Sequence, residues 1–168
     1  VLAEVVRRTC NDNRVQVQPR KILQEIPGFA NARRGDKPNK VDLAIVRPAI
    51  RTLVTAKWSV RADREKQFIT DYTEYQQAES NNQPFEYVFV TNEFDPARLM
   101  RACDKLSGNS RMFAHVVHIN TAAVLATYGL VGSTASNDEQ RDSMRQVLRH
   151  IEQHRLISLD EWLISMAC

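Results

Sequence analysis

The sequence has no apolar run long enough to cross a bilayer and no secretory leader, so we expect a soluble, intracellular protein. Its three cysteines, Cys10, Cys103 and Cys168, lie far apart and lack metal-ligand spacing. They are therefore predicted to be free thiols in a reducing compartment. Internal repeats and low-complexity tracts are also missing. Because the chain begins at Val1 rather than at methionine, we expect a further N-terminal segment to precede it.

Charge of one sign is not in large excess either, because the formal net charge is only +3 and the pI is about 8.9. This bias permits nucleic-acid binding but does not show it, since many ordinary domains are equally basic. The 168 residues are 43% hydrophobic and 26% charged, which fits one globular domain with a single core. The basic residues are unevenly distributed, with a concentration between residues 33 and 66.

The apolar pattern predicts both strands and helices, and hence an α/β fold with a sheet flanked by helices. Strand patterns occur in residues 15–18, 42–46, 52–57, 85–91 and 111–121. Helix patterns occur in residues 1–9, 20–26, 64–75, 96–103, 122–128 and 138–151. The helix over 122–128 is expected to end at Gly129, and a capping-box pattern at Ser158 starts a last short helix.

Residues 42–71 hold the densest set of side chains suited to catalysis. Asp42 opens one apolar run, and a second β-prone run ends on Lys57 after a break at Arg47 and Pro48. Two such runs predict a hairpin that brings Asp42 and Lys57 side by side. A carboxylate beside an ammonium at a strand end suits a metal ion and an attacking water. The alternative is a surface ion pair without chemistry.

This stretch resembles the signature D-x12-(D/E)-x-K of the PD-(D/E)xK nuclease superfamily. After Asp42 and twelve further residues the chain has Thr55, Ala56 and Lys57, so a threonine replaces the middle carboxylate. The pattern is similar to that of type II restriction endonucleases cutting CCGG or CCNGG cores, the NgoMIV and EcoRII group. In the CCGG-cutting members the missing acid comes from the following helix, about fourteen residues after the lysine, which corresponds to Asp71.

Two further segments carry the same resemblance. The group has the motif K-W-(S/T)-x-R-x-D-R, and this chain has Lys57-Trp58-Ser59-Val60-Arg61-Ala62-Asp63-Arg64. The segment VFVTNEFDPARL, residues 88–99, looks like the group's V-V-T-x-E-x-x-P-x-R-(L/I) pattern. The resemblance implies a single catalytic domain with a PD-(D/E)xK restriction-endonuclease-like core. Its parts are an N-terminal helix and basic loop (1–40), the nuclease core (41–121) and C-terminal helices (122–168).

The resemblance also implies Mg²⁺ held by carboxylates, with Asp42 as the first ligand and Asp71 as the second. Mg²⁺ prefers oxygen ligands and keeps several waters, so one or two carboxylates are enough. Lys57 would orient the attacking water and offset phosphate charge. Thr55 cannot supply a negative charge, so its expected role is a hydrogen bond beside the metal.

Two of the implied acids have alternatives. Asp71 also fits a solvated helix residue, and then Glu65 or Glu74 would be the replacement acid. The CCGG-cutting group further implies an acid from the N-terminal helix, and Glu4 is the one carboxylate in residues 1–9. An ordinary surface glutamate is the alternative for Glu4.

Arg61, Asp63 and Arg64 are the candidate base-reading residues. An arginine fork bonds O6 and N7 of guanine together, while a carboxylate accepts from N4 of cytosine. In the restriction-endonuclease group these positions read the CC:GG half of the site, so we expect a core with CC on one strand and GG on the other. The alternative is a helix-start cluster in which Asp63 is the N-cap.

The implied function is that of a type II site-specific deoxyribonuclease, which hydrolyses double-stranded DNA in a bacterial or archaeal cytoplasm and leaves 5′-phosphate ends. Because both strands of a palindrome are cut, at least a homodimer is implied. Two alternatives remain. One is another PD-(D/E)xK nuclease, of the repair or structure-selective kind, which would not need the base-reading cluster. The other is a catalytically silent DNA-binding module, motivated by the threonine at position 55.

Two other features have plain expectations. His150 and His154 have a helical i,i+4 spacing that can bind zinc, but no third ligand is apparent, so we expect surface or interface histidines. Trp58 is expected to be a core residue rather than a stacking group.

Overall fold

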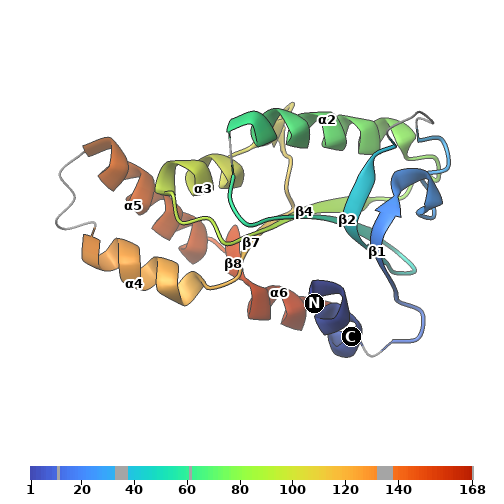
Figure 1. The fold of residues 1–168 in the computed structure, drawn as a ribbon, viewed down its shortest axis with the longest axis horizontal. Coiled ribbons are helices and arrows are strands. Elements are labelled where there is room, and N and C mark those ends of the chain that lie inside the picture. The colour runs from blue at the N-terminus through green and yellow to red at the C-terminus, as the bar shows by residue number, and fades with distance from the viewer. Residues whose placement is uncertain (11, 33–37, 61, 132–137, 168) are drawn as a thin grey trace. The chain divides into compact units, whose positions relative to one another are not determined.

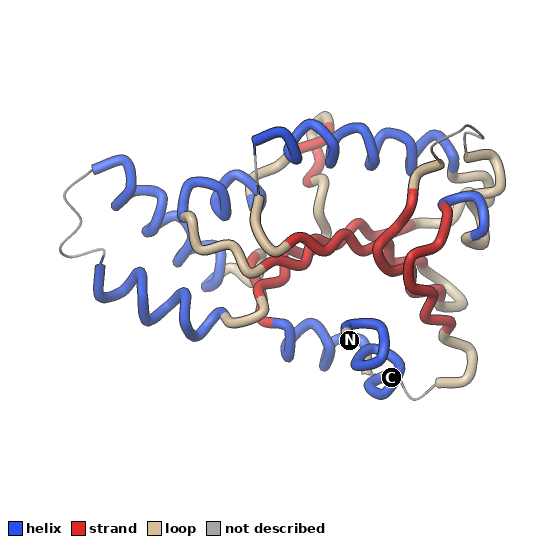
Figure 2. Tube along the Cα trace, in the orientation of Figure 1, coloured by secondary structure: helices blue, strands red, loops and turns tan. Residues whose placement is uncertain are grey.

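The computed structural model describes the chain except residues 11, 33–37, 61, 132–137 and 168, and the side chains of 62–65 and 131 are also outside the description. The chain forms two compact units, whose elements are drawn in Figures 1 and 2. Unit 1 comprises Val1–Ala56, Arg61–Val88 and Leu163–Cys168, and unit 2 comprises Lys57–Val60 and Phe89–Trp162. No helix in the described part of the chain has the length and apolarity needed to cross a membrane.

Unit 1 is built on neighbouring strands, namely β1 (Gln16–Ile22), β2 (Lys40–Val46), β3 (Arg51–Lys57) up to Ala56, and β4 (Phe85–Thr91) up to Val88. β2 runs antiparallel to β1 and to β3, which confirms the predicted hairpin. Most residues of β2 and β3 are buried, so side chains are covered on both faces of the sheet.

Helices lie on the two faces of these strands, with α2 (Ala62–Ala78) on one face and α1 (Leu2–Thr9) on the other (Figure 1). α2 places Phe68 and Tyr75 in the core, at 3% and 2% exposure, as their helical spacing predicts. The Tyr75 ring lies 5.3 Å from the Tyr87 ring of β4. Near α1, Cys10 Sγ donates to the backbone oxygen of Met166 at the end of α6 (Leu159–Met166).

Two sequence predictions in the N-terminal part are wrong. The first strand does not stop before Pro19 but continues to Ile22, and a short 3-10 helix, Leu23–Glu25, takes the place of the helix expected over residues 20–26. Pro19 is tolerated because β1 is the first strand of the sheet, and an edge strand can lack one ladder donor. Leu23 and Ile26 are buried, so their spacing reflects burial rather than a helix.

Unit 2 contains the end of β4, then β7 (His115–His118) and β8 (Leu156–Ser158) in that order, with β7 and β8 parallel. The sheet strands are therefore of mixed direction. Three further helices belong to this unit, namely α3 (Pro96–Cys103), α4 (Thr121–Val131) and α5 (Asp138–Glu152), and α5 contacts both α3 and α4. A small hairpin pairs β5 (Leu106–Ser107) with β6 (Ser110–Arg111).

The predicted helix starts in unit 2 are confirmed, but two boundaries are wrong. Asp95 caps α3 by accepting from the Arg98 backbone N–H at 2.9 Å, and Ser158 Oγ accepts from the N–H of Glu161 at 3.0 Å. The strand expected over residues 111–121 shrinks to β7, because Arg111 pairs within the small hairpin. α4 continues through Gly129, which lies in open space inside the helix.

Candidate active site

Asp42 and Thr55 face each other across β2 and β3. The strand register places Leu43 opposite Val54, so the residues beyond them, Asp42 and Thr55, are also opposite. Asp42 Oδ2 accepts the Ala56 backbone N–H at 2.9 Å and the Thr55 hydroxyl at 3.4 Å. Thr55 is 6% exposed, whereas Asp42 is half-buried. The threonine that replaces the expected carboxylate thus donates a hydrogen bond to Asp42, the first predicted metal ligand.

Asp71 lies on α2 in a polar pocket of about 370 Å³, lined by Pro38, Asn39, Lys40, Gln67, Asp71 and Glu74. The Asn39 amide, which immediately precedes β2, donates to Asp71 Oδ1 at 3.2 Å and to Glu74 Oε2 at 3.1 Å. Both carboxylates are half-buried. Two of the candidate replacement acids therefore share one amide donor at the start of the strand that carries Asp42.

Tyr75 and Tyr87 are two buried phenols whose pKa values respond to both Asp42 and Asp71. Burial raises the pKa of Tyr87 well above its ordinary value, and the negative charges of Asp71 and Asp42 raise it further. Burial also raises the pKa of Tyr75, followed by the effects of Tyr87, Asp71, Asp42 and Glu74. The charges of both aspartates thus raise the pKa of both phenols, which stay protonated.

An oxygen-rich site of this kind fits Mg²⁺. Among the described residues no group of three or more His, Cys, Asp or Glu side chains could hold a metal ion. Mg²⁺ nevertheless requires only one or two carboxylates, because it keeps several of its waters. The donors of Asp42 and Asp71 are oxygens, and the half-burial of both side chains leaves part of each accessible. The donor set thus suits a hard cation rather than zinc.

The other predicted site residues are placed as follows. Lys57 is the last residue of β3, is half-buried and belongs to unit 2. Glu4 lies on α1, where it is exposed and pairs with Arg7 at 3.5 Å and Arg8 at 3.0 Å. Arg61 is outside the described residues. Asp63, Arg64 and the alternative acid Glu65 lie in the first turns of α2, and their side chains are outside the description.

Two arginines of the basic segment are used within the fold. Arg51 is 2% exposed and donates to Glu79 at 2.8 Å. Arg47 donates to the Thr52 hydroxyl at 3.0 Å and to Glu86 at 3.3 Å. Their positive charges are thus paired inside unit 1, and the sequence concentration of basic residues overstates the charge available to a polyanion.

Several residues important to the site were missed by sequence reasoning. Glu93, buried within the recognised segment 88–99, accepts backbone N–H groups from Val60, Phe94 and Asp95 at 2.7, 3.0 and 2.9 Å. Its place in that motif was an available signal. Asn39 had no such signal, because only the folded chain places it beside α2. The same holds for the two phenols beside the aspartates.

Two sequence expectations about single residues are wrong. Trp58 is not in the core but 72% exposed. His154 lies beyond the end of α5 with a positive φ of 54°, so it does not share a helical face with His150. His150 is buried beside Asp104 at 3.1 Å, and His154 pairs with Glu161 at 2.7 Å, so each imidazole has a different carboxylate partner.

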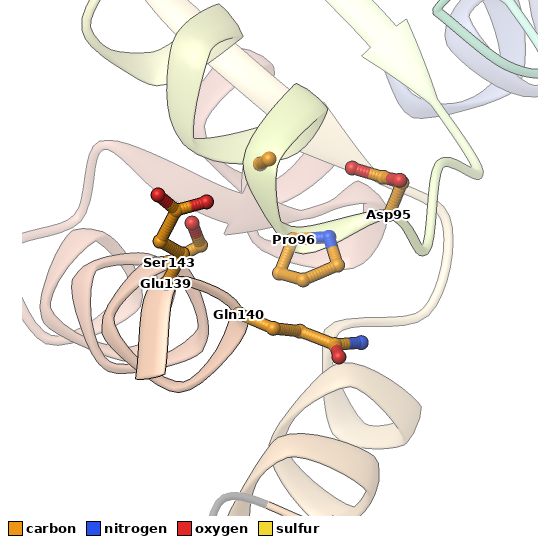
Figure 3. A pocket seen from close by; sticks show the side chains of 6 residues that line it. Asp95, Pro96, Glu139, Gln140 and Ser143 are labelled. Carbon is orange, nitrogen blue, oxygen red and sulfur yellow. The ribbon is translucent and has the colours of Figure 1, made fainter. Parts of the chain in front are cut away.

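A second pocket, of about 280 Å³, lies in unit 2 between the start of α3 and α5, and Figure 3 shows its lining. Glu139, Gln140 and Ser143 come from α5, and Asp95 and Pro96 from the start of α3 (Figure 3). None of the residues proposed from the sequence for catalysis or base reading lines this pocket.

Comparison with known proteins points to the fold. No protein-family model and no curated protein matches the sequence. Among solved structures, the chain is similar to that of the restriction endonuclease PspGI–substrate DNA complex, with a TM-score of 0.52, 10% identity and 90% of this chain covered. The match covers 53% of the PspGI chain, so this chain spans about half its length.

The small subunit of the heterodimeric restriction endonuclease R.BspD6I is also similar, with a TM-score of 0.41 and 10% identity over 98% of this chain and 84% of that one. The order of strands and the helices on both faces agree with the α/β architecture expected from the sequence. The chain therefore has the PD-(D/E)xK restriction-endonuclease-like fold, a mixed sheet flanked by helices.

Proposed function

We propose that this chain is a catalytic domain of a type II restriction endonuclease, which hydrolyses double-stranded DNA with Mg²⁺ at a site containing a CC:GG core. One observation carries the proposal: the Asn39 amide, just before β2, donates to Asp71 of α2 at 3.2 Å, and Asp42 within β2 accepts the Thr55 hydroxyl and the Ala56 N–H. A half-buried carboxylate on the strand pair and another on the helix bonded to the start of that strand suit a metal-dependent hydrolase. The fold shared with PspGI, whose structure contains substrate DNA, makes DNA the favoured substrate.

Each residue has a role that follows from its chemistry. When bound, Mg²⁺ lowers the pKa of a coordinated water and offsets charge on the phosphate. Asp42 and Asp71 would hold it, and the Ala56 N–H and Thr55 hydroxyl keep the Asp42 carboxylate oriented. Lys57 would hold the attacking water and stabilise the charge that develops on the phosphate. The water oxygen would bond to phosphorus while the P–O3′ bond breaks, and the 3′ oxygen would leave and take up a proton, which gives a 5′-phosphate and a 3′-hydroxyl. Glu4 is the further acid implied by the family resemblance.

Base reading is assigned to Arg61, Asp63 and Arg64. Two arginines and one carboxylate within four residues provide the donors and the acceptor that adjacent G·C pairs present in the major groove. A palindrome is cut on both strands, and one site cuts one strand, so two copies of the chain are required on each duplex. Arg61 and the first residues of α2 therefore set the specificity of the proposed enzyme.

The test is cleavage of unmethylated DNA with Mg²⁺. The wild type is compared with Lys57→Ala, Arg61→Ala and the control Lys21→Ala, whose exposed ammonium pairs with Glu25 at 3.3 Å on an edge strand. We expect discrete fragments from the wild type and from Lys21→Ala. Lys57→Ala should lose at least about 100-fold in rate, the usual effect of removing a charge that stabilises the transition state. Arg61→Ala should lose about 5- to 100-fold at the specific site, because a bidentate base contact is worth about 1–3 kcal/mol.

One alternative has a specific observation in its favour, since position 55 carries a neutral, buried threonine in place of an acid. A catalytically silent DNA-binding module would retain sequence-specific duplex binding without cutting in Mg²⁺. A smear of fragments instead of discrete bands would indicate a nuclease of the repair or structure-selective kind. Either result would overturn the proposed activity.

A further inference from the structure

Trp58 leaves most of an indole in water, although the protein buries its other tryptophan. Its exposed fraction is 72%, whereas that of Trp162 is 2%. Large aromatic side chains are normally among the most buried, and an exposed one often marks a binding surface. Trp58 therefore requires an explanation, which its backbone environment supplies.

The backbone around Trp58 is fixed rather than loose. The Trp58 carbonyl accepts from the Asn92 N–H at 3.3 Å and from the Thr91 hydroxyl at 3.5 Å. Two residues later, Val60 is 2% exposed and donates its N–H to Glu93 Oε2 at 2.7 Å. The segment of residues 58–60 is therefore attached at both ends to the residues that follow β4, and the indole is held outward.

Glu93 is the centre of this attachment. Its carboxylate is 6% exposed and accepts three backbone N–H groups, those of Val60, Phe94 and Asp95, at 2.7 to 3.0 Å. Arg98 adds an ion pair at 3.7 Å. Charge-assisted hydrogen bonds of this kind are stronger and more directional than neutral ones, so Glu93 holds the backbone at Val60 in place.

We infer that the Trp58 indole contacts the DNA duplex and that Glu93 is the residue that positions it. This inference rests on the proposed function and adds two residues to its DNA-binding surface. Consecutive Cα atoms lie about 3.8 Å apart, so a phosphate held by Lys57 lies within reach of the next side chain. The cations at Lys57 and Arg61 in the sequence, and the half-exposed Arg98, favour a polyanion over an apolar protein partner.

The contact is assigned to the deoxyribose of the backbone. Bases inside a duplex are already stacked on each other, and inserting a side chain between them has an unstacking cost. The flat apolar face of an indole packs against sugar rings without that cost, while Lys57 meets the neighbouring phosphate. Trp58 would then orient the duplex against Lys57, its neighbour in the chain, without reading bases itself.

The two tryptophans provide a direct spectroscopic test. Trp162→Phe leaves Trp58 as the one indole, and Trp58→Phe leaves the buried Trp162. Each variant is titrated in Ca²⁺ with a short duplex containing the CC:GG core, with labelled-DNA anisotropy as the independent measure of binding. We expect duplex binding to change the Trp58 emission and to protect it from acrylamide, and to leave the Trp162 emission unchanged.

Affinity and coupling complete the test. Trp58→Ala removes the apolar area that the indole buries against the sugars, so it should raise the duplex Kd by about 5- to 50-fold. Glu93→Gln should raise it in the wild type but add little in the Trp58→Ala background, because positioning requires the indole. An equal effect in both backgrounds would mean that Glu93 acts on the fold alone. Asp160→Asn, an exposed carboxylate of α6, is the control.

The outcomes separate this inference from the proposed function. Duplex binding with no change in Trp58 emission or acrylamide quenching overturns the inference and leaves the nuclease proposal intact. Absence of duplex binding by both measures overturns the two together. Circular dichroism and thermal unfolding of Glu93→Gln establish that the variant is folded, and the Trp58 titration decides the inference independently of that variant.

Discussion

The Thr55 hydroxyl lies against the Asp42 carboxylate, 3.4 Å from Oδ2, at the position where most PD-(D/E)xK signatures place a second acid. A neutral donor at this point stabilises the Asp42 charge, where a second carboxylate would repel it. In the proposed enzyme the second acid then comes from elsewhere, and Asp71 of α2 accepts from Asn39, just before the strand that carries Asp42. The hairpin and the helix would thus share the proposed site.

Restoring the acid should make the metal-free protein less stable and its response to metal larger. Thr55→Asp places a second carboxylate beside Asp42 in a position that is 6% exposed, so like charges meet with little water between them. We expect a lower Tm without metal, together with a larger Tm increase in Mg²⁺ than in the wild type, because binding to the native state stabilises it. Thermal unfolding with and without Mg²⁺ measures both.

Thr55→Val is the matched control, since it removes the hydroxyl without adding charge. It should lower the metal-free Tm slightly and show no enlarged Mg²⁺ response. If Thr55→Asp and Thr55→Val respond alike to Mg²⁺, Asp42 is not part of a cation site.

Gly28 should be the most sensitive glycine of the described chain to alanine substitution. It has a φ of +87°, and an added Cβ would collide with the guanidinium of Arg51. That guanidinium donates to Pro27 O at 3.2 Å and Gln83 O at 2.6 Å and cannot move away cheaply. Gly28→Ala should therefore lower the free energy of unfolding by more than the ~1–2 kcal/mol of the positive φ alone.

Two other glycines calibrate this prediction. Gly108 also has a positive φ, +60°, but an added Cβ meets nothing within 4 Å. Gly108→Ala should therefore lower the free energy of unfolding only by the cost of the positive φ. Gly129 lies within α4 in open space, and Gly129→Ala should stabilise by about 0.5–1 kcal/mol through helix propensity. Denaturant unfolding of the three variants gives the order, and a Gly28→Ala cost no larger than that of Gly108→Ala would refute the collision.

The elements that carry the site could be predicted because their signals are local. Asp42 opens one apolar run and Lys57 ends the next, with a short break between them, and two such neighbouring runs predict a hairpin. Phe68 and Tyr75 lie seven residues apart, on one face of α2, and both are buried. Asp71 lies between them in the sequence and is half-buried, and it was identified by the family resemblance, fourteen residues after Lys57, rather than by helical spacing.

The parts that could not be predicted depend on contacts between distant segments. Asn39 donates to Asp71 only because the start of β2 lies beside α2 in the folded chain. Glu93 accepts from Val60 only because the end of β4 lies beside residues 58–60. The backbone position of Trp58 has the same origin, because its carbonyl accepts from the Thr91 hydroxyl and the Asn92 N–H at the end of β4. A tryptophan is buried in most proteins, and that average preference gave the wrong prediction at this position.

Buried histidines should make the protein less stable in mild acid. Burial lowers the pKa of His118, which is 0% exposed, and also that of His150, below their ordinary value of 6.5. Below about pH 6.5 the unfolded chain therefore binds protons that the folded chain does not. Stability is highest above that value and falls as pH decreases toward the folded pKa values. Tm measured from pH 7.5 to pH 5 should decrease accordingly.

The hydrogen bonds of His118 identify a variant that should reduce the dependence of Tm on pH. Asn120 N–H donates to Nδ1 at 3.0 Å, so Nε2 carries the proton and donates to the Glu93 carbonyl at 3.0 Å. His118→Gln keeps an amide donor for that carbonyl but cannot titrate, so its Tm should vary less with pH. His154→Gln removes an exposed histidine and is the control. An unchanged slope in His118→Gln would exclude His118 as its source.

The choice between Asp71 and Glu74 as second acid can be decided by comparing their amide variants. Both carboxylates accept from the same Asn39 amide, at 3.2 and 3.1 Å, so either substitution disturbs that hydrogen bond equally. The two acids differ in their effect on the phenols. The charge of Asp71, like that of Asp42, raises the pKa of both Tyr87 and Tyr75, whereas Glu74 raises that of Tyr75. Asp71→Asn should therefore reduce DNA cleavage by at least about 100-fold while duplex binding in Ca²⁺ persists. Glu74→Gln should change cleavage by less than about tenfold, and the reverse order would assign the metal to Glu74.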